Sequence, residues 1–302
     1  MISKDKWLIA NSAADPISQA AERAVGQRMS AVLHYHPLAA FHSEDDVEHV
    51  HQLRVWCRRG VAAVDVFAPL LAPRKAAKAK KWLRRIRKSA GDARDLDVLA
   101  LRLDQDPNLA HAERQSYMDN LAPWRIEAQQ SIVTCFERAE QESAVKKLRR
   151  LAGSTKWRLA KTEPTLEVFA AHALQPYLQR FWKRAAGDLT DFERLHRLRI
   201  AGKELRYTME LLAAGFPKSF RTQLYPLVVD FQERLGRIND LSEASSRWQR
   251  WFRDATDGTS PRWETNSKTQ RELAVQAAAE FLVWWSTDRI EEFRASWRAV
   301  SK

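Results

Sequence analysis

Residues 51–59 read His51-Gln52-Leu53-Arg54-Val55-Trp56-Cys57-Arg58-Arg59, and the chain is organised around this stretch. At about 100° per residue in an α-helix, His51, Arg54 and Arg58 fall within about 60° of one another. The apolar residues between them point elsewhere and can pack against the protein. The stretch therefore predicts a helix with a basic stripe made of His51, Arg54 and Arg58.

A second copy of this pattern follows 145 residues later, at His196, Arg199 and Lys203. The same offset aligns residues 91–96 with residues 236–241, and in both segments a glycine is followed four residues later by an aspartate. Two separate motifs that share one offset, with no insertion between them, indicate an internal duplication.

The remaining chain shows helical spacing and no convincing strand alternation. The segment 153–164 has the composition of a linker. We therefore expect two halves, at residues 15–152 and 160–302. Each half is long enough for about four helices that close as a bundle. The prediction is an all-α fold of two four-helix bundles related by the duplication.

Proline and glycine predict where individual helices end. Pro37 is expected to close the first helix, because the residue before a proline disfavours helix. Gly91 is expected to lie inside one helix over 74–103, as a kink or a close approach. Pro123 is expected to interrupt a later helix, and residues 257–261 are expected to form a loop.

The charge balance points to an anionic partner. The 302 residues include 50 Lys and Arg against 38 Asp and Glu, a formal net charge of +12. Nucleic acid, an anionic membrane surface or a phosphate polymer would each suit this excess. General solubility is the alternative explanation.

The start of the chain lacks the apolar run of a signal peptide, and no stretch approaches the length of a transmembrane helix. The chain holds two cysteines, Cys57 and Cys135, which are too few for a disulfide framework. We expect buried free thiols and a cytoplasmic location. The 12 tryptophans are expected mainly to pack in the cores, although stacking platforms for bases are the alternative.

The two histidine stripes are candidate anion sites. An imidazole and two cations at one-turn spacing suit a ligand with repeating negative groups, since Arg offers paired donors and Lys a point charge. A solvated face or a row of salt bridges would explain a single stripe equally well, but the repetition favours function. Arg206 extends the second stripe, whereas Val61 stands at the equivalent place in the first.

A dense basic run over residues 74–88 supplies a further candidate surface. Lys78, Lys81, Arg85 and Lys88 share one helical face. Like charges at this spacing repel by a few tenths of a kcal/mol each, roughly, and a bound anion would relieve that repulsion. A face that only aids solubility is the alternative. The counterpart run over 220–233 contains acids, so the positive field is expected to be uneven.

The sequence gives little support for a metal site or for catalysis. The cations around His51 and His196 would repel a metal ion, and no phosphate loop, nucleophile elbow or zinc-protease motif is present. We therefore predict no cofactor, no metal and no catalytic activity. Asp95 and Asp240 could each orient a motif histidine or form an ion pair with a nearby arginine, and the sequence leaves both open.

The motifs resemble those of the CHAD domain, a histidine-bearing α-helical domain. The likeness rests on His51-x-x-Arg54-x-x-x-Arg58 with Gly91 to Asp95, and on His196-x-x-Arg199-x-x-x-Lys203 with Gly236 to Asp240. It covers about residues 15–300. Asn239 departs from the family pattern, which has an arginine before the second aspartate.

The resemblance implies two four-helix bundles with pseudo-twofold symmetry and a basic groove or pore between them that binds inorganic polyphosphate. It also implies location at cytoplasmic polyphosphate granules, beside other granule proteins. The binding residues expected from the stripes and the basic run are His51, Arg54, Arg58, Lys78, Lys81, Arg85, Lys88, His196, Arg199, Lys203 and Arg206. The alternative functions are RNA or DNA binding through the same surface and, less favoured, hydrolysis of short phosphate chains.

Overall fold

The computed structural model describes residues 5–8, 11–107, 109–159, 161–254 and 262–300. Within these residues the chain forms helices and no strand; the one β-type contact is an isolated bridge between Pro16 and Thr165. The prediction of an all-α fold is therefore confirmed. None of the described helices combines the length and apolar character that crossing a bilayer requires. The loop expected at 257–261 lies outside the described residues.

The chain divides into two compact units, Met1–Leu166 and Glu167–Lys302, called unit 1 and unit 2 below. The segment expected as a linker is bound to unit 1. The backbone N–H of Lys156 donates to the carbonyl oxygen of Leu70 at 2.9 Å, and that of Leu166 donates to Asp15 at 2.8 Å. These bonds assign the segment to unit 1.

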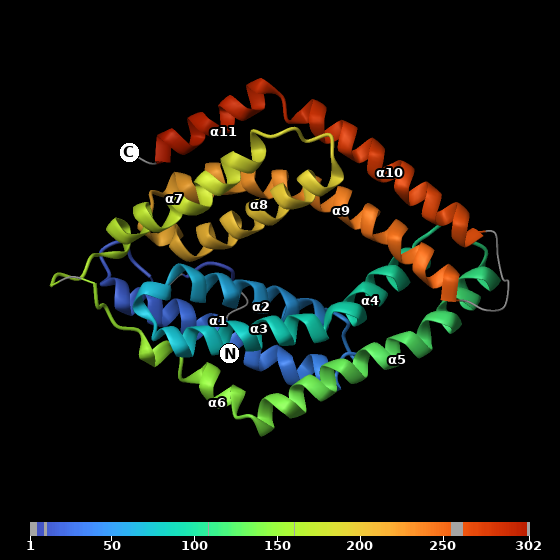
Figure 1. The fold of residues 1–302 in the computed structure, drawn as a ribbon, viewed down its shortest axis with the longest axis horizontal. Helices are drawn as coiled ribbons and strands as arrows, with labels where there is room; N and C mark the ends of the chain where they lie inside the picture. Colours follow the sequence, from blue (N-terminus) through green and yellow to red (C-terminus); the bar gives the residue numbers. More distant parts are fainter. Residues whose placement is uncertain (1–4, 9–10, 108, 160, 255–261, 301–302) are drawn as a thin grey trace. The chain divides into compact units, whose positions relative to one another are not determined.

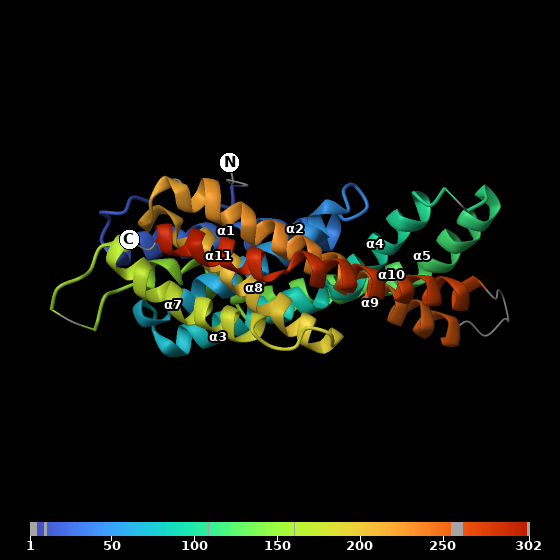
Figure 2. The same cartoon turned by 90° about the horizontal axis from the view of Figure 1, so that it is seen from above.

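Unit 1 holds the helices α1 to α6 (Figure 1). The longest is α5, which lies beside α4 in both views (Figures 1 and 2). One short 3-10 turn, η1, lies between α2 and α3, and another, η2, follows α6. The elements are α1 (Ile17–Phe41), α2 (Glu48–Val66), η1 (Ala68–Leu70), α3 (Pro73–Ser89), α4 (Gly91–Asp104), α5 (His111–Gln141), α6 (Ala144–Arg149) and η2 (Ala152–Ser154).

Unit 2 holds α7 to α11, of which α9 and α10 lie side by side (Figures 1 and 2). A π-helical turn, η4, precedes α9. The elements are α7 (Leu166–Ala185), α8 (Phe192–Leu212), η3 (Ala213–Gly215), η4 (Phe220–Leu224), α9 (Tyr225–Asp254), α10 (Arg262–Trp284) and α11 (Thr287–Val300). Each unit thus has more helical segments than the four expected, because several expected helices are divided.

Three predicted helix boundaries are wrong. Helix α1 continues through Pro37 to Phe41, where buried Ala39 and Ala40 hold the last turn against the unit. Helix α5 runs through Pro123 without interruption, since its flanking residues Leu121 and Ala128 are anchored in the core. The helix expected over 74–103 instead ends at Ser89 and restarts at Gly91 as α4.

Aromatic and aliphatic side chains fill both cores. In unit 2, Phe231 lies at the centre of an aromatic cluster with Phe181, Phe281, Trp285 and Phe293. Of the tryptophans expected in cores, Trp56, Trp82, Trp285 and Trp297 are buried. The side chains of Trp248, Trp251 and Trp263 lie outside the described residues.

Cys57 and Cys135 are free and buried, as predicted. Burial raises the pKa of the Cys57 thiol to about 12 and that of Cys135 above its usual value. Both thiols therefore stay protonated and unreactive at neutral pH.

Candidate functional site: two basic helix faces

Helix α2 carries the first stripe on the side opposite its packing face. Its inward side is apolar and buried, and includes Leu53 and Trp56. His51, Arg54 and Arg58 are half-buried on the other side. The predicted arrangement of this stripe is therefore present.

The two motifs of unit 1 meet at Arg54 and Gly91. The Arg54 guanidinium donates to the carbonyl oxygen of Arg87, at the end of α3, over 3.4 Å. A Cβ placed on Gly91 would lie 3.2 Å from Nη1 of Arg54. The Arg54 side chain therefore lies at the break between α3 and α4. Because Gly91 has no side chain, the Arg54 guanidinium fits beside it.

His51 stands among cations. Burial lowers the pKa of His51, Arg94, Arg58 and Arg54 lower it further, and Glu48 opposes them. The imidazole is therefore neutral at neutral pH, although it can become charged when an anion offsets the neighbouring arginines. This cluster of positive charge is the strongest indication of an anion site in unit 1.

Arg94 is a site residue that the sequence reasoning missed. It lies near the start of α4, within the Gly91 motif, and among charged residues it has the largest influence on His51. Arg94 lies within the motif that runs from Gly91 to Asp95, and this position could have identified it from the sequence. The 145-residue offset aligns Arg94 with Asn239, so the two halves differ in charge at this position.

The basic side chains of α3 lie on two different sides of the helix. Lys80 forms an ion pair with Asp65 of α2, which marks the edge of α3 that faces the first stripe. Lys78, Lys81, Arg85 and Lys88 lie roughly 80–160° around the helix from Lys80. Arg85 turns toward α5, lying 3.9 Å from a carboxylate oxygen of Glu142. The four predicted residues therefore form a face of their own beside the stripe.

In unit 2, α8 carries the second stripe. Asp191 caps the helix by accepting a hydrogen bond from the backbone of Glu193. His196 is exposed, while Arg199 and Lys203 are half-buried. The stripe again occupies one helix face, with buried Leu195 and Leu198 on the other.

Two residues of α9 hold the second stripe in place. Nδ1 of His196 lies 2.7 Å from Oδ1 of Asn239, and Nδ1 donates because an amide oxygen only accepts. Nη2 of Arg199 lies 3.7 Å from Oδ1 of Asp240. Of the two roles left open for Asp240, the structure shows the ion pair, and Asn239 takes the role of orienting the histidine.

The glycines of the two halves differ in their surroundings. A Cβ on Gly202 of α8 would lie 2.1 Å from Nε2 of Gln232 and 3.3 Å from Phe231, so α8 and α9 approach closely there. Gly236, which the offset aligns with Gly91, has no neighbouring atom within 4 Å of its Cβ position among those described. The aligned glycines therefore have different surroundings.

Arg206, the last residue of the second stripe, is half-buried. Its guanidinium is 5.1 Å from the Tyr207 ring, and Glu210 beside it accepts a hydrogen bond from Tyr225 at 2.8 Å. Burial alone would lower the pKa of Arg206, but Tyr207, Glu210 and Tyr225 together raise it. Part of its charge is thus already balanced inside unit 2.

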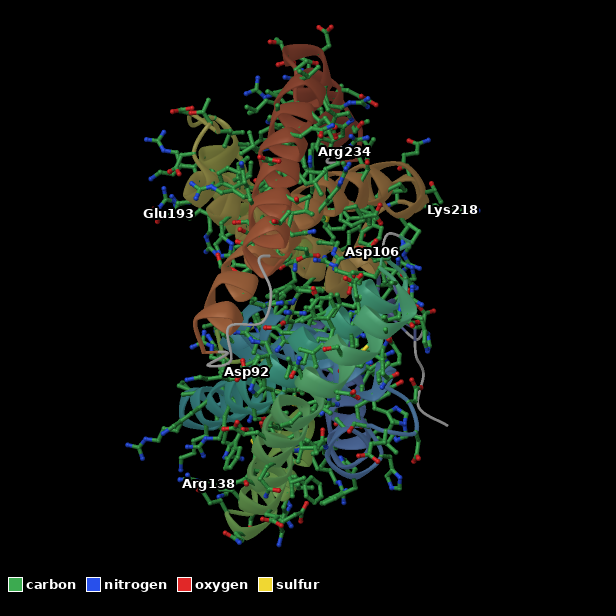
Figure 3. All side chains as sticks on the ribbon, turned by 90° about the vertical axis from the view of Figure 1, so that its right-hand side faces the viewer. Asp92, Asp106, Arg138, Glu193, Lys218 and Arg234 are labelled. Carbon is green, nitrogen blue, oxygen red and sulfur yellow. The ribbon has the colours of Figure 1, made fainter. Side chains whose placement is uncertain are left out.

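A hollow of about 290 Å³ lies beside His196, between α8 and α9. Its apolar part includes Leu195 and Ile238, and Glu193 and Glu243 border it. These acids pair with Arg197 and Arg247. Figure 3 shows Glu193 extending outward from unit 2, on the side opposite Lys218. The second stripe therefore has acidic neighbours at its first turn.

Within the described residues, no group of three or more His, Cys, Asp or Glu side chains is arranged to hold a metal ion. The basic stripes offer hydrogen-bond donors and positive charge. Their chemistry suits the binding of phosphate oxygens.

Comparison with known proteins gives one family and two related structures. The family model described as the CHAD domain matches residues 10–249. The crystal structure of the CHAD domain from the plant Ricinus communis matches with a TM-score of 0.69 and 20% identity, covering 95% of this chain and 93% of that one. PptA from Streptomyces chartreusis matches with a TM-score of 0.57 and 14% identity, covering 94% and 100%. A comparison with curated proteins gives no match.

Proposed function

Since this chain belongs to the CHAD family, we propose that it binds inorganic polyphosphate through the α2 and α8 stripes and that this binding targets it to polyphosphate granules. The observation that carries the proposal is the cluster of Arg54, Arg58 and Arg94 around His51, whose pKa is lowered by burial and further by these cations. The positive charges of such a cluster repel one another, and a phosphate chain would relieve the repulsion.

The first stripe would bind the polymer with its arginines. The Arg54 guanidinium is positioned by the Arg87 carbonyl, so that less freedom is lost when it binds. Arg58 and Arg94 add two further guanidinium groups beside it. Each offers paired donors that match two oxygens of a phosphate group.

The second stripe would act through Arg199 and Lys203, with His196 oriented by Asn239. Arg199 is only 15% exposed at its side chain and is held by Asp240. Because Glu210 lies beside it, Arg206 would contribute mainly through its electrostatic field and not through direct contact with phosphate.

The α3 face would extend the contact for longer chains. Lys78, Lys81 and Lys88 are exposed, and Arg85 is half-buried. Each additional phosphate that meets a cation releases counterions, as in protein–nucleic acid complexes. Affinity is therefore expected to grow with chain length and to fall steeply with salt.

The test measures binding of fluorescent polyphosphate by anisotropy at several salt concentrations. Changing both Arg54 and Arg199 to Glu is expected to abolish binding, and changing both to Gln to weaken it by about tenfold or more. The control changes Arg138 and Arg298 to Glu, which alters the net charge equally at side chains 56% and 72% exposed. Equal binding by the stripe and control variants, all shown to be folded, would place the site elsewhere.

Nucleic acid is the competing polyanion. We expect excess polyphosphate of matched charge to displace bound RNA at fixed salt. RNA that stays bound would favour a nucleic-acid-binding function. The proposal also holds that the protein is not an enzyme, so incubation with a divalent metal and triphosphate should release no orthophosphate. Fluorescence microscopy of a tagged chain in cells with and without granules tests the targeting.

A further inference from the structure

A hollow of about 240 Å³ lies in unit 1 between α3 and α6. Its base is apolar and buried, formed by Ala79, Trp82 and Leu148. Its edge is formed by four exposed cations, Lys75, Lys78, Lys147 and Arg150. The hollow therefore combines an apolar interior with a positively charged edge.

The edge of the hollow carries a net positive charge. None of the described residues that line the hollow is acidic. The Lys147 ammonium donates to the carbonyl oxygen of Glu142 at 2.6 Å and has two further N–H groups to offer. The Glu142 carboxylate is already engaged, by Arg138 at 2.7 Å and Arg85 at 3.9 Å. Negative charge supplied by a ligand would therefore be favoured here.

The apolar base of the hollow determines which kind of group a ligand can insert. Arg85 covers the Trp82 ring at 4.9 Å, and the remaining base is formed by Ala79 and Leu148. A polar group inserted there would lose water without gaining a partner. The inserted group should thus be apolar, with acidic groups outside it.

We propose that this hollow binds an acidic segment of a partner protein, which inserts one large apolar side chain while its carboxylates contact the four cations. A nucleobase fits less well, because its polar edge would face the apolar base. A lipid acyl chain would extend beyond a hollow of this size. Anchoring by one buried side chain within a polar rim is a common way for proteins to recognise peptides.

The probes are two fluorescein-labelled peptides of nine residues, Gly-Glu-Glu-Glu-Phe-Glu-Glu-Glu-Gly and the same peptide with Ser in place of Phe, measured by anisotropy on the full chain without polyphosphate. The Phe peptide is expected to bind about tenfold more tightly. Changing Lys147 and Arg150 to Glu should weaken its binding by about tenfold. The control changes Lys146 and Arg149 to Glu. These two residues are exposed neighbours on α6 that do not line the hollow, and the control should lower the affinity by no more than about threefold.

An Ala79→Leu variant, checked for folding by circular dichroism, fills the hollow and should remove the preference for Phe while leaving binding of the Ser peptide. Equal affinity for the two peptides would overturn the proposal, as would a preference that survives in Ala79→Leu. Binding of ATP or of phosphatidylglycerol vesicles that depends on Lys147 and Arg150, without a preference between the peptides, would also overturn it. Lys147 and Arg150 lie outside the proposed polyphosphate set, so either proposal can fail alone.

Discussion

Nδ1 of His196 lies 2.7 Å from the side-chain oxygen of Asn239, and this amide stands where the first half has Arg94. The two motif histidines therefore have different neighbours. The pKa of His51 is lowered by burial and by the guanidinium groups around it, whereas His196 is oriented by a neutral amide. If the stripes bind phosphate, the contribution of His51 should depend on its protonation, and the contribution of His196 should depend on the geometry of this hydrogen bond.

Replacing Asn239 by Arg should strengthen polyphosphate binding. The change restores the cation that the first half has at this place, and each added phosphate contact steepens the salt dependence by a slope of about 0.7–0.9. We expect a rise in affinity of about threefold or more at low salt. Asn239→Ala, which removes the bonds to His196 and Asp240 without adding a cation, serves as the control and should not raise affinity. An unchanged salt slope in Asn239→Arg would contradict the prediction.

Polyphosphate binding should take up protons near and below pH 6.5. The pKa of His51 is lowered in the free protein, and a bound anion would raise it by favouring the imidazolium. Because the complex then holds more protons than the free protein, affinity should fall as pH rises through this range. Titration calorimetry at pH 6 in buffers of different ionisation enthalpy measures the uptake.

The His51→Asn variant should take up fewer protons. His172→Asn is the matched control, since His172 is exposed on α7 and bonds to the carbonyl of Val168. Equal proton uptake by the parent and His51→Asn would show that His51 does not titrate on binding.

The protein should lose stability in mild acid because of His36. Burial lowers the pKa of His36 to about 4, and its Nε2 has no hydrogen-bond partner among the described residues. Between pH 6.5 and about 4 the unfolded chain binds a proton at this residue that the folded chain excludes, so stability falls as pH falls. The loss should be on the order of 3 kcal/mol over this range.

Urea unfolding at pH 7 and pH 4.5 measures this loss. Since carboxylates also contribute, the informative quantity is the difference between the parent and His36→Phe, whose ring would sit beside Phe136. The variant should lose less stability on acidification. Parallel losses would mean that His36 is protonated in the folded state.

Substitutions at two glycines should differ in their effect on stability. Gly202→Ala places a methyl group against buried Gln232 and Phe231 and should destabilise unit 2 by about 1–3 kcal/mol. Gly236→Ala meets no described atom within 4 Å and should be neutral or stabilise α9 by about 0.5–1 kcal/mol. Thermal unfolding of the two variants compares them directly. A larger loss in Gly236→Ala would contradict the observed packing of α8 against α9.

Periodicity predicted the features that repeat along a helix. The positions of His51, Arg54 and Arg58 on one face follow from 3.6 residues per turn. The all-α fold follows from helical spacing along the whole chain without strand alternation. Contacts between helices could not be obtained this way. That Asp240 pairs with Arg199 while Asn239 meets His196 depends on how α8 and α9 cross, which a single sequence does not state.

Local breaker rules failed where tertiary packing outweighed them. Pro37 and Pro123 lie within continuous helices because buried neighbours stabilise the turns around them. At Ala90 the opposite happened: the chain breaks without a proline, and Arg54 occupies the space beside Gly91. Recognising that break requires knowing that Arg54 reaches it.

The bridge between Pro16 and Thr165 joins the beginning of unit 1 to its end. Ile17 and Leu166 complete this closure with backbone bonds to Pro164 and Asp15. A folding unit whose entry and exit lie together can be copied in tandem with only a short connection and little change to its interior. Joined ends also make circular permutation of unit 1 feasible, with new termini in an exposed loop.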